Sequence, residues 1–320
     1  MARRRPDPEA GLAAVRALRD ADDKTLLAEL PASLLGWGPI VAMAAELAGS
    51  RGLVALQPAL AAAWARLEED PVTRDPGCTG KAACAAALDA LDHTDRGLFL
   101  RGASYVQMQP VWGRSEDKAG ELRARCLFAL ARFGGTEALV ALAKGLADPL
   151  PEVRAAAAQA LRGTGEAAAA ALAVLVIRRG DEARGVVADA LGSLLALRPD
   201  EGLAEATRLL RGDDEELVEL AALALGQSHL PEALTPLEEA LTTAFRPGPR
   251  RTLLLAMGLL RSEPARVRLL TVVRAGPLGD ARAAIEALGA SAVGVGLRVK
   301  VEEAAKGRGL EAAIEAAFGG

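Results

Sequence analysis

The sequence predicts an all-α protein made of stacked helix hairpins. Hydrophobic residues make up 51% of its 320 residues but aromatic residues only 3%, so the core has to consist of Ala, Leu and Val. Alanine has the highest helix propensity and lets helix axes approach closely. The β-branched and aromatic residues that strands favour are too few for a sheet protein. A pattern that recurs about every thirty residues indicates that the helices form repeats.

Each repeat begins with a segment that has an acidic or polar start, a basic or polar residue two or three positions later and a leucine nine positions after the start. Successive leucines lie 29 to 34 residues apart. One such unit cannot bury its apolar face alone, so the units must stack. The segments are ELRARCLFAL (121–130), EVRAAAAQAL (152–161), EARGVVADAL (182–191), ELVELAALAL (216–225), RRTLLLAMGL (250–259) and, more weakly, GDARAAIEAL (279–288).

A second helical stretch follows each segment, so a unit consists of helix, tight turn and helix. Breaks such as ADPLP and RGDDE separate one unit from the next. Four glycines lie where the first helix of a unit is expected to end, and we expect left-handed C-caps there. They are Gly163, Gly192, Gly226 and Gly289.

The repeat resembles HEAT-like repeats, and its short form is similar to the repeats of phycobilisome-lyase type. The resemblance covers residues 117–290 and implies a right-handed α-solenoid. It is carried best by Asp148, Pro149, Glu152, Val153, Arg154, Ala157, Ala160 and Leu161.

Three regions are expected along the chain. Residues 1–76 form a helical region that we interpret as divergent first hairpins, residues 77–290 form the repeats, and residues 291–320 form a polar capping pair of helices. In the first region, helices are expected at roughly 9–19, 22–35, 39–49 and 52–68.

Charge and hydropathy exclude several classes of protein. The net charge is −4, so the chain lacks the excess of positive charge that phosphate-driven binding to nucleic acid uses. The amino terminus has no apolar run of the kind that a secretory signal needs, and no apolar run is long enough to span a bilayer. We therefore expect a cytoplasmic protein without a membrane partner, with its three cysteines as reduced thiols.

No group of residues specifies a reaction. His93 could pair with Asp89, but a histidine favoured by a helix C-terminus is the better interpretation. Cys78 and Cys84 have too many residues between them for a zinc ligand pair, so Cys84 is expected to be a buried apolar residue. We expect no catalytic residue, metal or cofactor.

The segment GCTGKA (77–82) has only two residues between its glycines, against four in a phosphate loop. Thr79 is instead expected to cap a helix that begins at Gly80 or Lys81. A cation at a helix start is unfavourable, which suggests that Lys81 pairs with a nearby carboxylate or ligand.

The chief anomaly is an insertion at about 105–116, within YVQMQPVWGRSEDKAG (105–120). Pro110 forbids a helix there, and the alternation directs Tyr105, Gln107 and Gln109 to one side and Val106, Met108 and Pro110 to the other. Two interpretations stay open. Either Met108, Val111 and Trp112 fasten the insertion to the repeats while the glutamines satisfy backbone groups, or the insertion is a recognition surface. Its charged rim would be Arg101, Arg114 and Lys81, whereas Phe128 and Phe133 are expected to be core residues.

The favoured function is a non-catalytic scaffold or adaptor that binds another protein through the repeats and the 105–116 loop. The resemblance to bilin lyases implies an alternative, an enzyme or chaperone for a cofactor-bearing protein. A second alternative is nucleic-acid binding, as in HEAT-like alkylpurine DNA glycosylases, along basic residues near the ends of second helices. Helix C-termini favour cations in any case, so the dipole explains those residues better. They are Lys144, Arg178, Arg179, Arg208, Arg211, Arg246 and Arg274.

Overall fold

The computed structural model describes residues 8–291 and 296–319, and apart from one β-hairpin the regular secondary structure of these residues is helical. The all-α fold of stacked hairpins is therefore confirmed. The chain divides into two compact units, Met1–Thr164 and Gly165–Gly320. This division falls inside the stretch 77–290 that the repeat pattern covers.

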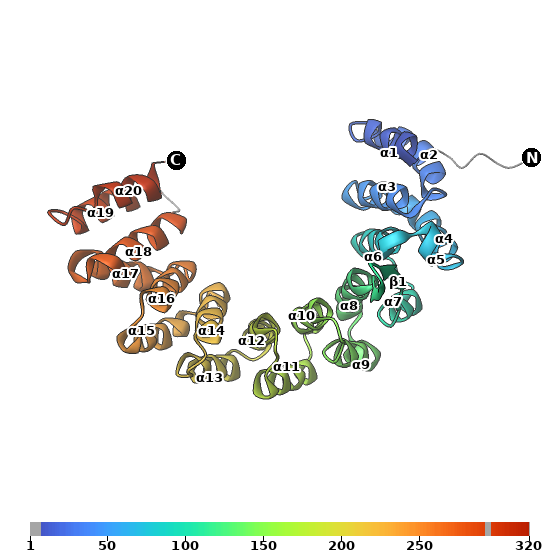
Figure 1. Ribbon diagram of the computed structural model, residues 1–320. Helices are drawn as coiled ribbons and strands as arrows, with labels where there is room; N and C mark the ends of the chain where they lie inside the picture. The colour runs from blue at the N-terminus through green and yellow to red at the C-terminus, as the bar shows by residue number, and fades with distance from the viewer. Residues whose placement is uncertain (1–7, 292–295, 320) are drawn as a thin grey trace, which may run out of the picture. The chain divides into compact units, whose positions relative to one another are not determined.

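In unit 1 the first helices of successive hairpins lie side by side in one row and the second helices form another row (Figure 1). The first row is α1 (Pro8–Ala17), α3 (Gly38–Ser50), α6 (Thr79–Ala90), α8 (Gly120–Phe133) and α10 (Pro151–Ala160). The second row is α2 (Asp23–Leu34), α4 (Gln57–Glu68), α7 (Arg96–Gly102) and α9 (Gly135–Gly145). Short helices lie between them: η1 (Val54–Leu56), α5 (Pro71–Arg74), η2 (Pro76–Cys78) and η3 (Leu161–Thr164).

Unit 2 repeats the arrangement. Its first row is α12 (Arg184–Leu197), α14 (Glu215–Ser228), α16 (Pro247–Leu259), α18 (Leu278–Ala290) and α20 (Glu311–Phe318). Its second row is α11 (Ala167–Arg179), α13 (Pro199–Leu210), α15 (Leu234–Thr243, preceded by η4, Pro231–Ala233), α17 (Glu263–Ala275) and α19 (Leu297–Ala304).

The core between the two rows consists mainly of alanine, leucine and valine, as the composition requires. The leucines that define the repeat, such as Leu130, Leu161, Leu191 and Leu225, are fully buried. Phe99 is also fully buried and packs against Phe133 with ring centroids 5.9 Å apart. Burial of this kind contributes roughly 1.5–3 kcal/mol for each large apolar side chain.

Phe128 is an exception among the aromatic residues that were expected in the core. It lies on α8, but 36% of its surface is exposed. Leu127 and Leu130 on the same helix are fully buried. Because neighbours in sequence point about 100° apart on a helix, Leu127 takes the core direction and Phe128 is turned away from it.

The expected glycine C-caps are wrong. Gly192, Gly226 and Gly289 lie inside α12, α14 and α18, Gly163 lies in η3, and none of the four has a positive φ. Gly226 and Gly289 instead allow neighbouring repeats to touch. A Cβ on Gly226 would lie 2.5 Å from the carbonyl oxygen of Ala256, and one on Gly289 2.6 Å from that of Ala317. These glycines therefore serve close helix packing rather than helix termination.

A recurring arginine–aspartate pair joins successive repeats. In unit 1 Arg123 binds Asp148, and in unit 2 Arg184 binds Asp214, with Nε–Oδ2 distances of 2.8 Å in both pairs. Arg250 binds Asp280 in the same way and also donates to two backbone carbonyls at the end of α15. In each pair the arginine lies near the start of a first-row helix and the aspartate lies at or before the start of a later one, so the pairs set the register of the stack.

No described helix is both long and apolar enough to cross a membrane.

Candidate interaction site at the β-hairpin

The insertion folds as a β-hairpin between α7 and α8. Strand β1 (Met108–Val111) pairs antiparallel with β2 (Arg114–Asp117), with Val111 opposite Arg114 and Met108 opposite Asp117. The two turn residues, Trp112 and Gly113, have φ values of 46° and 81°. Two positive φ angles define a type I′ turn, which matches the twist of a hairpin. The extended segment that the alternation predicts is thus present, and Trp112 and Gly113 reverse the chain into a second strand.

The polar side of the hairpin faces inward. Gln107 and Gln109 are buried, so the expectation that they lie on a recognition surface is wrong. Gln107 Nε2 donates to the carbonyl oxygens of Asp75 (2.7 Å) and Pro71 (3.2 Å). Gln109 Oε1 accepts from the backbone N–H of Gly77 at 3.0 Å. The glutamines therefore bind the backbone of the loop that precedes α6, in addition to the hydrogen bonds that this loop makes within itself.

Beneath the hairpin lies a fully buried ion pair between Asp75 and Lys81. Lys81 Nζ donates to Asp75 Oδ2 at 2.8 Å, and neither side chain is accessible to solvent. Lys81 therefore does not belong to a charged rim. Its pairing with a carboxylate explains why a cation is tolerated in the first turn of α6.

Asp75 also takes the capping role that was expected of Thr79. Its carboxylate accepts from the N–H groups of Gly80 (2.7 Å) and Lys81 (3.1 Å). The residue before α6 is Cys78, whose side chain makes no cap, and Thr79 is the first residue of the helix. The cap comes from four residues before the helix because the chain turns at Gly77, where φ is 75°.

Tyr105 joins the hairpin to this ion pair. Its ring centroid lies 5.3 Å from Lys81 Nζ, a cation–π distance. Burial raises the pKa of the Tyr105 phenol to about 12, and the nearby acids Glu68 and Asp75 contribute. The phenol therefore stays neutral at physiological pH. Tyr105 connects the start of the hairpin with the buried ion pair through its contact with Lys81.

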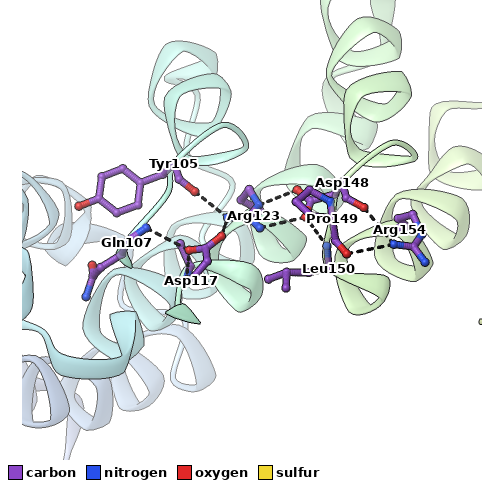
Figure 2. A network of polar contacts seen from close by, with 9 residues as sticks. Tyr105, Gln107, Asp117, Arg123, Asp148, Pro149, Leu150 and Arg154 are labelled. Atoms are coloured by element: carbon purple, nitrogen blue, oxygen red, sulfur yellow. Dashed lines mark hydrogen bonds and ion pairs between the residues drawn. The ribbon is translucent and has the colours of Figure 1, made fainter. Parts of the chain in front are cut away.

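Arg123 fastens the base of the hairpin to α8 (Figure 2). Its Nη1 donates to the carbonyl oxygen of Tyr105 at 2.8 Å and to Asp117 Oδ2 at 2.6 Å. Burial raises the pKa of the Asp117 carboxyl. Hydrogen bonds from Ala119 N, Gln107 N and Arg123 outweigh that effect, so the pKa lies below its ordinary value. The hairpin is held by contacts at both its inner face and its base.

The apolar side of the hairpin faces solvent. Trp112 is 100% exposed, Val106 is 59% exposed and Met108 is 49% exposed. Met108 and Trp112 therefore do not fasten the insertion to the repeats, so that part of the first interpretation is wrong. Val111 is half-buried, and the glutamines bind backbone groups as the same interpretation expected. We call these three residues the outer face of the hairpin.

Two further residues expected at the site are arginines. Arg101 of α7 and Arg114 of β2 are both exposed, and neither side chain forms a hydrogen bond or ion pair with any residue that the structure describes. Of the seven residues expected at the site, the structure thus leaves Trp112, Arg101 and Arg114 accessible, with Tyr105 partly so. It buries Gln107, Gln109 and Lys81 as the support beneath them.

The other candidate residues do not assemble into a reactive group. His93 Nδ1 lies 3.1 Å from Gln57 Oε1, whereas Asp89 binds Arg132. In unit 2 five of the basic residues near second-helix ends are paired with acids. Arg178 and Arg208 share Glu205, Arg179 pairs with Asp181, Arg211 binds Glu239 and Arg246 binds Glu215. Within residues 8–291 and 296–319 no three His, Cys, Asp or Glu side chains are grouped to hold a metal ion.

Sequence reasoning missed Asp75, Asp117 and Arg123 as members of the site. Arg123 occupies the same place in its repeat as Arg154 and Arg184. The alignment of the repeats could therefore have predicted that Arg123 is a buried residue with a structural role. Asp75 and Asp117 carried no comparable signal, because each lies outside the repeated helices, in the loop before α6 and in the hairpin.

The stacked hairpins define the chain as an α-helical repeat protein. Residues 112–196 match the family described as HEAT repeats, so these repeats are HEAT-like. Repeats of this family generally mediate interactions between proteins. A solved structure of an engineered protein from the Northeast Structural Genomics Consortium is similar to the chain at 18% identity. The similarity covers 92% of this chain and 81% of that one, with a TM-score of 0.36. No curated protein sequence matches the chain.

Proposed function

We propose that this chain is a non-catalytic scaffold that binds another protein through the outer face of its β-hairpin. The observation that carries the proposal is Trp112, which is fully exposed while its φ is 46°. A bulky residue in the left-handed region is strained, and an exposed tryptophan also loses the benefit of burial. The type I′ turn requires the positive φ, but it does not require an indole at this position. A partner that covers the indole would explain why a tryptophan stands there.

The surroundings of Trp112 suit recognition. Val106 and Met108 extend the apolar area, and tryptophan and methionine are enriched at protein interfaces. Arg101 of α7 and Arg114 of β2 add exposed positive charge to this part of unit 1, since neither side chain is paired with a described acid. A partner with an apolar centre and acidic edges would match this arrangement.

The support beneath the hairpin makes the surface preorganised. The Gln107, Gln109 and Arg123 contacts fix the inner face and the base before any partner arrives. A rigid surface loses little conformational entropy on binding, which favours affinity. The buried contacts of Gln107, Gln109 and Arg123 thus hold the outer face in a fixed position.

The test compares wild type with Trp112→Asn and Phe245→Ala as baits in affinity capture from a lysate of the native host. Asn-Gly is the favoured type I′ turn, so Trp112→Asn should keep or strengthen the hairpin while it removes the indole. Phe245 is 94% exposed in unit 2 and serves as the matched aromatic control. We expect a stoichiometric partner protein with wild type and Phe245→Ala but not with Trp112→Asn.

Recovery of the same protein by all three baits would contradict the proposal. So would a bound nucleic acid or chromophore without any partner protein. Circular dichroism of the Trp112→Asn variant controls for folding, because its helical signal should match that of wild type.

A further inference from the structure

We propose that unit 2 carries a second binding site, independent of the hairpin, for an acidic peptide segment of another protein. The site is a groove of about 680 Å³ between α16, α18 and α20. This volume lies within the range of about 300–1,000 Å³ that is usual for ligand sites. The three helices belong to successive hairpins of the first row, so the groove crosses the repeats and suits an elongated ligand.

Part of the lining of the groove consists of small apolar residues. Ala283 of α18 and Ala313, Ala316 and Ala317 of α20 line it, with Pro247 and Pro277 at the helix starts. The close approach of Gly289 to Ala317 brings α18 and α20 together at one end. Short side chains leave a hollow there that can accept apolar groups of a peptide.

The charges of the groove favour an anion. Arg250, Arg251 and Arg282 line it, against Asp280 and Glu286. Arg250 is committed to Asp280 and to the carbonyls of Leu241 and Ala244. Arg282 is exposed and forms no ion pair with any residue in the described part of the chain. One cation is therefore in excess.

The guanidinium of Arg251 can also bind a ligand, because its present ion pair is weak. Arg251 pairs with Glu286 through two hydrogen bonds, but both side chains are about half exposed. Exposed pairs of this kind contribute little to stability, so a ligand carboxylate can compete for Arg251. Arginine binds carboxylates through two parallel hydrogen bonds, which gives the site its chemical preference.

The lining fits nucleic acid less well. Three arginines against Asp280 and Glu286 leave an excess of one positive charge, which suits a single carboxylate better than a chain of phosphates. Among its lining residues there is no aromatic side chain on which a base could stack. A carboxylate-bearing peptide with small apolar residues is the ligand that the lining fits.

The experiment selects a phage-displayed library of random dodecapeptides on the full chain carrying Trp112→Asn, which excludes peptides that need the hairpin indole. The most enriched peptide is then synthesised with a fluorophore, and its affinity is measured by anisotropy. We expect enrichment of Asp or Glu beside small apolar residues. We also expect Arg282→Glu to weaken binding by about tenfold or more. The matched control is Arg274→Glu, an exposed arginine outside the groove, which should bind as the parent does.

Failure to enrich any peptide, enrichment of peptides without acids, or equal binding by Arg282→Glu would overturn the proposal. Because every protein in this experiment lacks the Trp112 indole, none of these outcomes depends on the proposed function of the hairpin. Far-UV circular dichroism of Arg282→Glu confirms that a loss of binding is not a loss of fold.

Discussion

Arg123 donates two parallel hydrogen bonds to Asp148, from Nε to Oδ2 at 2.8 Å and from Nη2 to Oδ1 at 3.0 Å. Asp148 lies in the loop that opens the next repeat, and its Oδ1 also accepts from the N–H of Leu150 at 2.9 Å. The remaining guanidinium nitrogen, Nη1, holds the hairpin base at Asp117. One side chain thus joins the hairpin, α8 and the loop before α10 (Figure 2).

Replacing Arg123 with lysine should destabilise unit 1, because an ammonium keeps the charge but loses the planar fork. We expect the free energy of unfolding to fall by about 1–3 kcal/mol. Tryptophan fluorescence reports on this unit, since Trp37, Trp64 and Trp112 all lie in it. The control is Arg125→Lys, whose exposed pair with Glu121 should contribute less than about 1 kcal/mol. Equal effects of the two changes would contradict the role given to Arg123.

The anchoring by Asp117 should depend on pH. Because its folded-state pKa lies below that of an unfolded aspartate, the carboxylate stabilises the fold above about pH 4. This contribution is lost as the pH falls through the folded-state pKa. Carbon-detected NMR titration of the Asp117 carboxyl should show the lowered midpoint. Asp117→Asn should remove that part of the acid sensitivity, and a midpoint at or above the ordinary value would refute this assignment.

Lys81→Met should be strongly destabilising. It leaves the Asp75 carboxylate fully buried without its cation, and breaking a buried pair in this way costs about 3–5 kcal/mol. Lys118→Met is the matched change, since Lys118 pairs with Glu116 at the surface and should matter little. Chemical denaturation followed by tryptophan fluorescence compares them. Similar midpoints for the two variants would show that the buried pair is unimportant.

Two glycines inside first-row helices of unit 2 should respond in opposite directions to alanine. Gly226→Ala places a Cβ 2.5 Å from the carbonyl oxygen of Ala256, so it should cost about 1–3 kcal/mol. Gly192→Ala meets nothing within 4 Å, so it should stabilise α12 by about 0.5–1 kcal/mol. Thermal unfolding by circular dichroism measures both. Stabilisation by Gly226→Ala would mean that the helices of neighbouring repeats are not in close contact there.

The three cysteines should be unreactive while unit 1 is folded. Cys78, Cys84 and Cys126 are buried, and burial raises the pKa of Cys78 and of Cys84 to about 12 and that of Cys126 well above its usual value. A chromogenic thiol reagent at neutral pH should therefore label them only as the unit opens, because the thiolate is the reactive form. Immediate labelling of one equivalent would show that a thiol is accessible.

The insertion shows where sequence reasoning succeeded and where it failed. The alternation in YVQMQPVW correctly separated Tyr105, Gln107 and Gln109 from Val106, Met108 and Pro110. It could not show which set faces the protein. Polar residues usually face solvent, but here the glutamines face inward and form hydrogen bonds with the backbone of the loop before α6. Trp112-Gly113 also lacks the asparagine that would have marked a type I′ turn.

What the sequence determined by itself is the repeated helix hairpin. Its period, its leucines and its alanine-rich core are local properties, and they recur often enough along the chain to be recognised without a structure. The tertiary structure alone decided the burial of Lys81 against Asp75, the orientation of the hairpin and the packing role of Gly226. Each of these features depends on a contact with another part of the chain. Such contacts produce no recurring pattern in the sequence, so they cannot be recognised from it.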